Sequence, residues 1–177
     1  MNKNLILIID FGQTHVKFFA LNKKNKLVHI KIYKNNFILK NKVYDLSTLQ
    51  NFVIDTINNI IKKFNVNKIS YVTHGSSLFY IDSKGKIKSG YAYNAKIINT
   101  NLNLLFSKIM PSFDISFTHL YGCFNNLGKN FFFLKDKIIN FLTFPSFLGF
   151  ILTKKNIIDY TYLGCHSFLW NFKKKKN

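Results

Sequence analysis

The start of the chain has the hydrophobic pattern of a small sheet. Residues 5–9 form an unbroken apolar run that ends at Asp10, which is typical of a strand buried in a sheet. Residues 15–21 and 27–33 have strand composition, and the short polar stretch between them has the length of a hairpin connection. The pattern therefore predicts three antiparallel strands, the first of which ends at an acidic residue.

A helical pattern follows the predicted strands. Ser47 and Gln50 form an S-x-x-Q capping box, which marks the start of a helix. The apolar residues around and after it recur at helical spacing and are Leu49, Phe52, Val53, Ile57, Ile60, Ile61 and Phe64. This is the strongest helix prediction in the chain.

The pattern after this helix gives two more strands before it becomes less regular. Residues 68–73 and 78–81 predict these strands. The later elements that we expect are a turn over 82–85, a helix over 96–109, a loop over 122–128, two helices within 129–152 that meet near Pro145, and a short element over 159–170. Because no linker divides the chain, we expect one domain over residues 1–172 and a lysine-rich tail over residues 173–177.

Composition places the chain among globular proteins. It has 177 residues, of which 47% are hydrophobic and 17% aromatic, enough for a sizeable core. The formal net charge of +19 would suit a nucleic-acid partner. However, all 26 basic residues are Lys, although Arg is better suited to bidentate contacts with phosphate or guanine. We interpret the charge as a by-product of biased composition and expect no specific nucleic-acid binding.

The sequence has no pattern typical of secretion or of a membrane span. The apolar run at residues 5–9 is too short for a signal sequence. Residues 138–152 fall short of the about 18 to 20 apolar residues that a span needs, and we expect a buried helix there. Cys123 and Cys165 lie far apart and form no CxxC pair, which favours reduced, buried thiols. We therefore expect a cytoplasmic protein without a membrane partner.

The turn after the first strand carries the most informative residues, which are Asp10, Gly12, Thr14 and Lys17. A carboxylate at a strand end can hold a magnesium ion, and a following glycine lets backbone N–H groups approach phosphate oxygens. Thr14 adds a hydroxyl donor, and Lys17 adds a positive charge for a nucleotide phosphate. The same D-x-G-x-T spacing also suits an ordinary hairpin turn, so both interpretations are open at this point.

The segment from Leu5 to Leu21, which ends in LIIDFGQTHVKFFAL, resembles the first phosphate-binding hairpin of the actin, Hsp70 and sugar kinase superfamily. Three further stretches are similar to the FGGY carbohydrate kinases: ISYVTHGSSLFYIDSKGKI at 69–87, NNLGKNFFFLK at 125–135 and TFPSFLGFILTKKNIIDYTYLGCHSFLW at 143–170. The resemblance implies a ribonuclease-H-like α/β fold with a mixed sheet and flanking helices. It also implies a kinase that uses ATP and Mg²⁺ to phosphorylate a sugar or polyol.

The resemblance further implies roles for single residues. Asp10 would handle magnesium, and the nucleotide phosphates would be lined by Gly12, Gln13 and Thr14. The sugar pocket would be bordered by Thr73, His74 and Gly75, and the segment that closes over the sugar would contain Asp159, Thr161, Cys165 and His166. Without the family, His74 also suits a plain turn and Asp159 also suits a cap.

The chain also departs from the family. In FGGY kinases the general base lies late in the first domain and the adenine site lies in a second domain, and this sequence stops before both. We therefore expect an N-terminal fragment that is inactive alone. The gene would be either degraded or split, and in the second case the partner is a separately encoded C-terminal half. Residues 91–94 lack the charged side chains that many relatives carry there, so the sugar is not identified.

Two alternatives to this kinase interpretation are open. The first is a non-catalytic basic protein that binds nucleic acid or an anionic surface through its lysines, and a contiguous lysine face would favour it. The second is a different kinase of the same superfamily, which would share the Asp10 hairpin but not the segment from Thr161 to Trp170.

Overall fold

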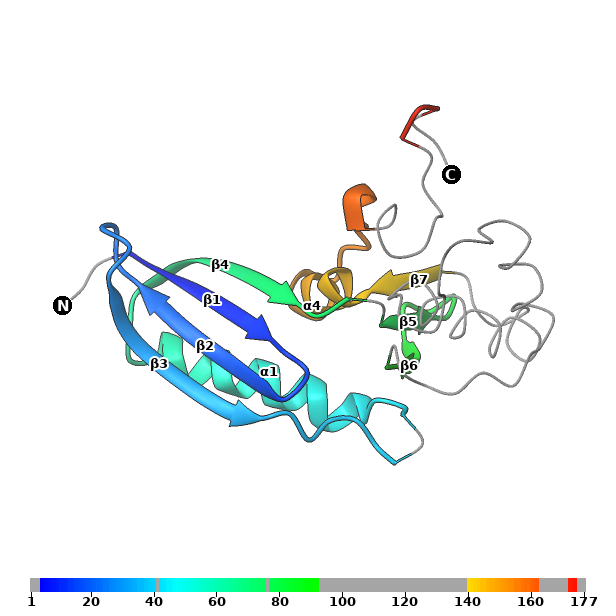
Figure 1. The fold of residues 1–177 in the computed structure, drawn as a ribbon, viewed down its shortest axis with the longest axis horizontal. Coiled ribbons are helices and arrows are strands. Elements are labelled where there is room, and N and C mark those ends of the chain that lie inside the picture. Colours follow the sequence, from blue (N-terminus) through cyan, green and yellow to red (C-terminus); the bar gives the residue numbers. More distant parts are fainter. Residues whose placement is uncertain (1–3, 41, 76, 93–139, 163–171, 175–177) are drawn as a thin grey trace, which may run out of the picture. The chain divides into compact units, whose positions relative to one another are not determined.

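The computed structural model describes residues 4–40, 42–75, 77–92, 140–162 and 172–174 (Figure 1). The chain forms two compact units that interleave in sequence. The first contains Met1–Phe37 and Asp45–His74, and the second contains Ile38–Tyr44 and Gly75–Asn177. The short segment Ile38–Tyr44 therefore belongs to the second unit, although the residues before and after it belong to the first. The prediction of one domain over 1–172 stays a prediction.

The first unit is a four-stranded mixed sheet with the strand order β3-β2-β1-β4. Its strands are β1 (Leu5–Phe11), β2 (His15–Leu21), β3 (Leu27–Lys34) and β4 (Val66–Thr73). β1 pairs antiparallel with β2, and β2 pairs antiparallel with β3, which confirms the three predicted antiparallel strands. β4 pairs parallel with β1 on its other side.

Helix α1 (Leu46–Ile61) covers one face of this sheet (Figure 1). The β1 residues that point to this face are fully buried and include Leu7 and Ile9. Phe18 on β2 packs edge-on against Phe52 of α1, with ring centroids 5.9 Å apart. The buried α1 residues Leu49, Val53, Thr56, Ile57 and Ile60 complete this core. Every second residue of β1 is buried, and these residues form one hydrophobic layer with the buried residues of α1.

The predicted capping box at Ser47 and Gln50 is wrong, because α1 begins earlier, with Asp45 as its N-cap. The Thr48 backbone N–H donates to Asp45 Oδ1 at 3.2 Å. The Ser47 hydroxyl donates to the same oxygen at 3.1 Å. Aspartate is as strong an N-cap as serine, and Asp45 lies three residues before a backbone N–H that the helix leaves without an internal partner. Ser47 therefore supports the cap instead of forming it.

The second unit contains a three-stranded antiparallel sheet with the order β6-β5-β7. Its strands are β5 (Leu78–Ile81), β6 (Ile87–Tyr91) and β7 (Asn140–Thr143), and helix α4 (Phe144–Thr153) follows β7. The predicted turn over 82–85 is confirmed. Asp82 Oδ1 accepts from the backbone N–H groups of Lys84 at 3.0 Å and Lys86 at 2.8 Å.

The second unit corrects part of the prediction of two helices within 129–152, of which residues 129–139 lie outside the described residues. Residues 140–143 pair with β5 and therefore form a strand, β7. Leu142 of this strand is fully buried. A short apolar run has no periodicity that distinguishes a strand from a buried helix. The second predicted helix is confirmed as α4, with Pro145 in its first turn. The buried helix expected over 138–152 is therefore confirmed only from residue 144 onward.

The segment 38–44 is held in the second unit by backbone pairing. Val43 forms an isolated antiparallel bridge with Tyr91. The Tyr44 N–H donates to the Gly90 carbonyl at 2.8 Å, and the Ala92 N–H donates to the Lys42 carbonyl at 2.9 Å. The segment thus depends on residues that come far later in the sequence.

Several predicted elements lie outside the described residues. These are the helix over 96–109, the loop over 122–128, and the short element over 159–170 apart from its first residues, of which 160–162 are helical. In the described part of the chain, no helix combines the length and apolar character that a membrane span requires.

Candidate active site

The parallel pairing of β1 and β4 brings two predicted site segments to one edge of the first sheet. Phe11 pairs with Thr73 at the carboxyl ends of the two strands. The His74 backbone N–H then donates to the Phe11 carbonyl at 3.1 Å. The Asp10 hairpin and the Thr73–His74 segment therefore lie side by side, as expected for strand ends that form a ligand site in an open α/β sheet. Gly75 follows directly and belongs to the second unit.

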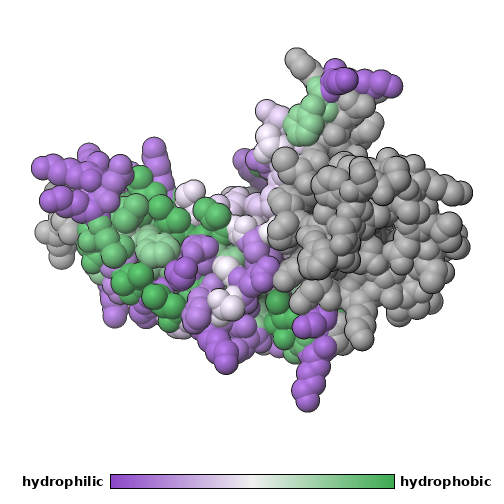
Figure 2. Space-filling model, in the orientation of Figure 1, coloured by the Kyte–Doolittle hydropathy of each residue, from purple (hydrophilic) through white to green (hydrophobic). Residues whose placement is uncertain are grey.

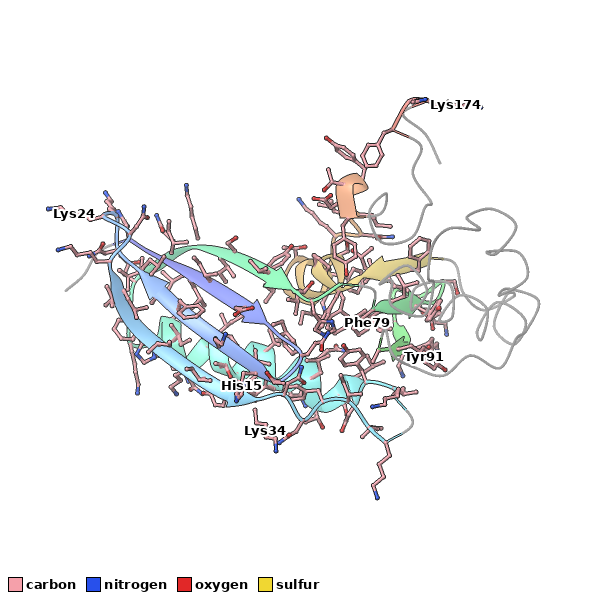
Figure 3. The ribbon with its side chains drawn as sticks, viewed as in Figure 1. His15, Lys24, Lys34, Phe79, Tyr91 and Lys174 are labelled. Atoms are coloured by element: carbon pink, nitrogen blue, oxygen red, sulfur yellow. The ribbon has the colours of Figure 1, made fainter. Side chains whose placement is uncertain are left out.

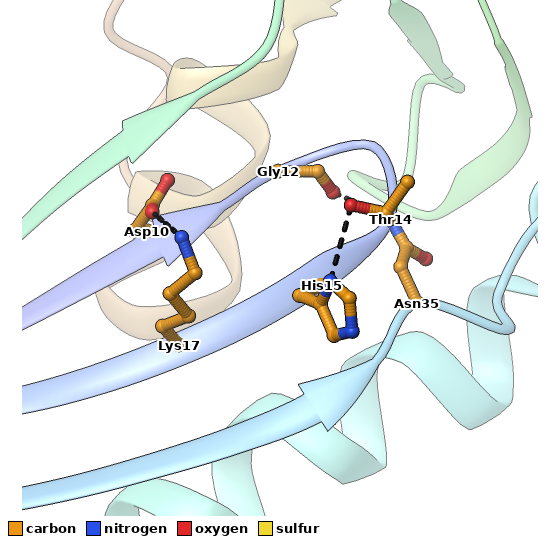
Figure 4. Close-up of polar contacts among 6 residues, drawn as sticks. All are labelled: Asp10, Gly12, Thr14, His15, Lys17 and Asn35. Carbon is orange, nitrogen blue, oxygen red and sulfur yellow. Dashed lines mark hydrogen bonds and ion pairs between the residues drawn. The ribbon is translucent and has the colours of Figure 1, made fainter.

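Asp10 and Lys17 form an ion pair across β1 and β2 (Figure 4). The Lys17 Nζ lies 3.1 Å from Asp10 Oδ2, and the two side chains are 38% and 35% exposed respectively. An ion pair with this much solvent contact contributes little to stability. Both charged groups are thus placed at the strand end where an incoming ligand can reach them.

The tight turn after β1 depends on Gly12. Its N–H donates to the His15 carbonyl at 3.0 Å. A Cβ atom at position 12 would lie 2.9 Å from that same carbonyl oxygen, a distance at which the backbone must shift. Glycine is therefore required by the close approach of the two hairpin strands.

Asn35, which follows β3, fixes the hairpin from the side (Figure 4). Its side-chain Nδ2 donates to the Gly12 carbonyl at 2.8 Å, and its backbone N–H donates to the Thr14 carbonyl at 2.9 Å. Two carbonyl oxygens that would repel a phosphate are therefore engaged by Asn35. Sequence analysis did not identify this residue, because its role depends on the register of β3 against the hairpin.

The tip of the hairpin is solvent-exposed. Gln13, Thr14 and His15 are all exposed. The Thr14 hydroxyl and His15 Nδ1 lie 3.1 Å apart, within hydrogen-bond distance. The predicted phosphate-contacting side chains are thus accessible at the end of a hairpin whose backbone is held by neighbouring groups.

The predicted sugar-side residues Thr73, His74 and Gly75 are all half-buried. Among the side-chain atoms that the structure describes, Thr73 Oγ1 is buried and makes no hydrogen bond. A buried hydroxyl without a partner is unfavourable by about 1–3 kcal/mol, so Thr73 is a candidate donor or acceptor for a ligand hydroxyl.

Asp159 caps the helical residues 160–162. Its Oδ1 accepts from the backbone N–H groups of Thr161 at 2.7 Å and Tyr162 at 3.0 Å, and from the Thr161 hydroxyl. The Thr161 hydroxyl and these N–H groups lower the pKa of the Asp159 carboxyl below its usual value. The capping alternative for Asp159 is thus observed, while Cys165 and His166 lie outside the described residues.

Asp10 is the candidate magnesium residue, and the arrangement around it suits that ion. Among the described residues, no three His, Cys, Asp or Glu side chains gather into a metal site. Mg²⁺ does not need such a cage, because it commonly takes one or two carboxylates, phosphate oxygens and several waters. The partly exposed Asp10 carboxylate supplies the type of ligand that this coordination requires.

Comparison with known proteins identifies the fold. No protein-family model matches the sequence, and no curated protein matches it. A carbohydrate kinase from Novosphingobium aromaticivorans matches 97% of this chain with a TM-score of 0.75 and 16% identity. A ligand-bound xylulose kinase from Lactobacillus acidophilus matches 98% with a TM-score of 0.71 and 17% identity. A Plasmodium falciparum glycerol kinase with ADP matches 98% with a TM-score of 0.61 and 18% identity.

At sequence identities this low, the structural matches establish the fold but not the activity or the substrate. The predicted fold class, an α/β fold with a mixed sheet and flanking helices, is confirmed. The resemblance to carbohydrate kinases is confirmed at the level of the fold. The chain spans 38% of the length of the first and second of these kinases and 39% of the third.

Proposed function

We propose that this chain is part of an ATP-dependent carbohydrate kinase of the FGGY type, which transfers a phosphoryl group to a hydroxyl of a sugar or polyol. One observation carries the proposal. In a fold shared with carbohydrate kinases, the Asp10 hairpin adjoins the Thr73–His74 segment at the carboxyl edge of the sheet. A phosphate-binding hairpin and a sugar-binding strand end must adjoin for phosphoryl transfer, because the acceptor and the phosphate have to lie in line.

The hairpin would form the nucleotide side of this site. Asp10 would hold Mg²⁺, which neutralises charge on the phosphates when bound. Gly12, Gln13 and Thr14 would line the phosphate oxygens. Lys17 balances the charge of Asp10 and carries further N–H donors that can contact a phosphate. Asn35 would act as a positioning residue, since it fixes two carbonyl groups of the hairpin.

The strand end of β4 would form the sugar side. Thr73, His74 and Gly75 would border the substrate, and the buried Thr73 Oγ1 would gain a partner from a substrate hydroxyl. His166 is proposed to contribute to the same pocket on the basis of the sequence resemblance. The buried Thr73 hydroxyl would favour a polyhydroxylated ligand, because such a ligand supplies the hydrogen bond that this group lacks.

The activity of the whole protein is part of the proposal, because the chain spans 38% of the kinases that it resembles. Phosphoryl transfer depends on positioning of both substrates and on charge stabilisation. We propose that the general base and the adenine site come from the remaining part of the kinase. A cytoplasmic location stays a prediction.

The lysines of the first unit support the kinase over a nucleic-acid-binding protein. Lys24 lies in the turn before β3, and Lys34 is the last residue of that strand (Figure 3). Lys31 stacks over the ring of Tyr33 at 6.0 Å, and its pairing with Phe18 places it on the α1 face. Lys34 lies on the opposite face, in register with His15. These lysines are spread over both faces, whereas a nucleic-acid site gathers them on one.

Nucleotide binding by the 177-residue chain tests this proposal directly. We expect calorimetry to detect magnesium-dependent ATP binding that Asp10→Asn weakens roughly 10- to 100-fold, the range expected for a lost charge-assisted contact. Asp55→Asn is the matched control, because Asp55 is an exposed acid on α1 away from the hairpin. Equal binding by both variants, or ATP binding that does not depend on magnesium, would contradict the assignment of Asp10.

A further inference from the structure

One end of the first sheet brings together segments that are far apart in sequence. Strand register places Leu27, Leu21, Ile6 and Lys68 in one row across β3, β2, β1 and β4. This row borders the turn over residues 22–26, which joins β2 to β3. Because β1 and β4 run from this row toward their carboxyl ends, the row lies at the end of the sheet opposite the candidate active site.

The carboxyl end of α1 lies at the same end of the first unit. The His29 ring of β3 and the Phe64 ring after α1 have centroids 5.0 Å apart. The Leu5 N–H donates to the Asn65 carbonyl at 2.9 Å, which holds the connection after α1 against the start of β1. Three segments therefore present exposed lysines together, and we call this surface the basic end. It is defined by Lys23, Lys24, Lys26, Lys62, Lys63 and Lys68.

The turn between β2 and β3 carries its lysines on an ordered backbone. Asn22 Oδ1 accepts from the backbone N–H groups of Lys24 at 2.9 Å and Lys26 at 3.0 Å. Asn25 has a φ of 56°, in the left-handed region that asparagine visits more readily than most residues. These features fix the backbone of the turn, while its lysine side chains are exposed to solvent (Figure 3).

No described carboxylate balances the basic end. The acids in the described part of the first unit are Asp10 and Asp45, which lie at the other end of the unit, and Asp55. Asp55 lies about 10 Å before Lys62 along the helix axis. None of the six lysines forms an ion pair with a carboxylate that the structure describes. Figure 2 shows hydrophilic residues gathered at this end, where Lys24 lies in Figure 3. Repulsion among these charges favours an anionic partner.

Exposed aliphatic side chains lie among the lysines. Leu27 is 54% exposed, and Ile61, the last residue of α1, is 46% exposed. A bilayer with anionic headgroups attracts clusters of about four to eight lysines or arginines. Apolar side chains that enter the boundary between headgroups and acyl chains strengthen such binding. The basic end offers both kinds of contact.

A nucleic acid matches the basic end less well. Its recognition relies on arginine forks and on aromatic rings that stack with bases, and all basic residues of this chain are Lys. The rings nearest to the lysines, His29 and Phe64, are half-buried against each other. The six lysines surround the end of the sheet and do not line one of its faces. A bilayer requires only positive charge and apolar contact.

We propose that the basic end docks the first unit on an anionic lipid bilayer. The lysine ammonium groups contact the charged headgroups, and Leu27 and Ile61 enter the headgroup boundary. The expectation of no membrane partner rests on the lack of a spanning pattern, which a surface that docks peripherally does not need.

Docking at the basic end leaves the candidate active site away from the lipid, a point that rests on the proposed function. β1 runs from Leu5 to Phe11, which at about 3.3 Å per residue spans about 20 Å. This length exceeds the Debye length of about 8 Å at physiological ionic strength. The negative bilayer therefore does not repel ATP from the hairpin.

Vesicle binding by the 177-residue chain tests the proposal. The probes are vesicles of phosphatidylcholine alone and vesicles of phosphatidylcholine with phosphatidylserine in a ratio of about two to one. We expect co-sedimentation to show binding to the phosphatidylserine vesicles at least about tenfold tighter than to the neutral vesicles, and weaker at higher salt. Equal binding to both, or no binding to the phosphatidylserine vesicles, would overturn the proposal.

Two matched pairs of lysines locate the binding surface. Lys24 and Lys26 in the first unit, and Lys84 and Lys86 in the second, are exposed and donate backbone N–H bonds to the same type of turn-capping oxygen. Each lysine near an anionic surface strengthens binding about fivefold. We therefore expect Lys24→Gln with Lys26→Gln to weaken vesicle binding roughly 25-fold. Lys84→Gln with Lys86→Gln removes the same charge and should leave binding nearly unchanged, and an equal loss there would contradict docking at the basic end.

Leu27→Ser separates a bilayer from a nucleic acid, because it keeps every charge of the basic end. We expect it to weaken binding to the phosphatidylserine vesicles about threefold to tenfold, through loss of an apolar contact. Unchanged vesicle binding would exclude insertion of Leu27. A single-stranded RNA that binds where these vesicles do not, and that Lys24→Gln with Lys26→Gln releases, would make a nucleic acid the partner and the proposal wrong.

Magnesium-ATP binding is measured in the same samples. It should be unchanged in Lys24→Gln with Lys26→Gln and in the presence of vesicles. Absence of vesicle binding with intact ATP binding would overturn the docking proposal alone. Vesicle binding without ATP binding would overturn the kinase assignment alone.

Discussion

Asp10 and Lys17 are direct partners across β1 and β2, with Lys17 Nζ 3.1 Å from Asp10 Oδ2. The pairing joins the candidate magnesium residue to the candidate phosphate contact before any ligand arrives. Because both side chains are partly exposed, the pair is easily rearranged and contributes little to folding. The pair instead places two charged groups at the strand end, where a ligand can contact them.

Removal of the lysine should therefore affect ligand binding more than stability. We predict that Lys17→Met weakens ATP binding roughly 10- to 100-fold, since it deletes a charged donor, and leaves the melting temperature nearly unchanged. Calorimetric titration and a thermal melt measure the two effects. Lys63→Met, an exposed lysine after α1, is the control, and a loss of equal size there would show a nonspecific charge effect.

The Asn35 side chain gives a test of hairpin positioning. Asn35→Asp keeps the shape of the side chain and the acceptor for the Phe37 N–H, but it cannot donate to the Gly12 carbonyl. We predict a destabilisation of about 1–3 kcal/mol for this lost bond and weaker ATP binding. Denaturant unfolding and titration measure these effects. Unchanged ATP affinity in a destabilised variant would limit Asn35 to a purely structural role.

The N-cap of α1 predicts a specific dependence of stability on pH. Bonds from the Thr48 hydroxyl and backbone N–H lower the pKa of Asp45 below its ordinary value of 3.8. Because the folded-state pKa is depressed, the stabilisation is present above the unfolded-state pKa and is lost as the pH falls through the folded value. We predict that Asp45→Asn, which keeps a capping oxygen, reduces the loss of thermal stability between about pH 5 and pH 2.

The control for the cap is chosen from the same helix. Asp55→Asn changes an exposed acid of α1 that is not the N-cap of the helix. Its melting temperature should follow the unmodified chain across the acid range. An identical pH profile for Asp45→Asn and the unmodified chain would exclude Asp45 as a contributor to acid unfolding.

Turnover is predicted to require more of the kinase than this chain contains. The chain spans 38% of the kinases it resembles, and a general base alone contributes roughly 10²- to 10⁴-fold. We predict no phosphorylation at a typical kinase rate with ATP and Mg²⁺ in excess. The assay measures ADP production across ketoses, aldoses and polyols. Turnover of roughly 1 per second or faster that is lost in Asp10→Asn would show that the 177 residues suffice.

The sequence predicted the elements whose pattern is local. The first three strands and the existence of α1 followed from apolar periodicity, because each buries one regular face. The start of α1 is not predictable in this way, since Asp45 and Ser47 are both competent caps and only the packed helix decides between them. The same is true of strand β7, because its pairing partner, β5, lies far away in sequence.

The candidate site was predictable only in part, for the same reason. Asp10, Gly12 and Thr14 stand together in sequence, and their spacing carries chemical information without any fold. Asn35 carries no such signal, because an asparagine after a strand is a common turn residue. Its contact with Gly12 exists only once β2 and β3 have paired in register.

The segment 38–44 has a consequence for the order in which the chain is made. All strands of the first unit have been synthesised once His74 has left the ribosome, so this unit can fold early. Lys42, Val43 and Tyr44 leave the ribosome before their backbone partners at Gly90–Ala92. Until those partners emerge, the segment can form only its local backbone bonds, such as the one from the Leu39 N–H to the Val43 carbonyl. A synonymous change that slows translation between residues 75 and 92 would lengthen that interval without altering the protein.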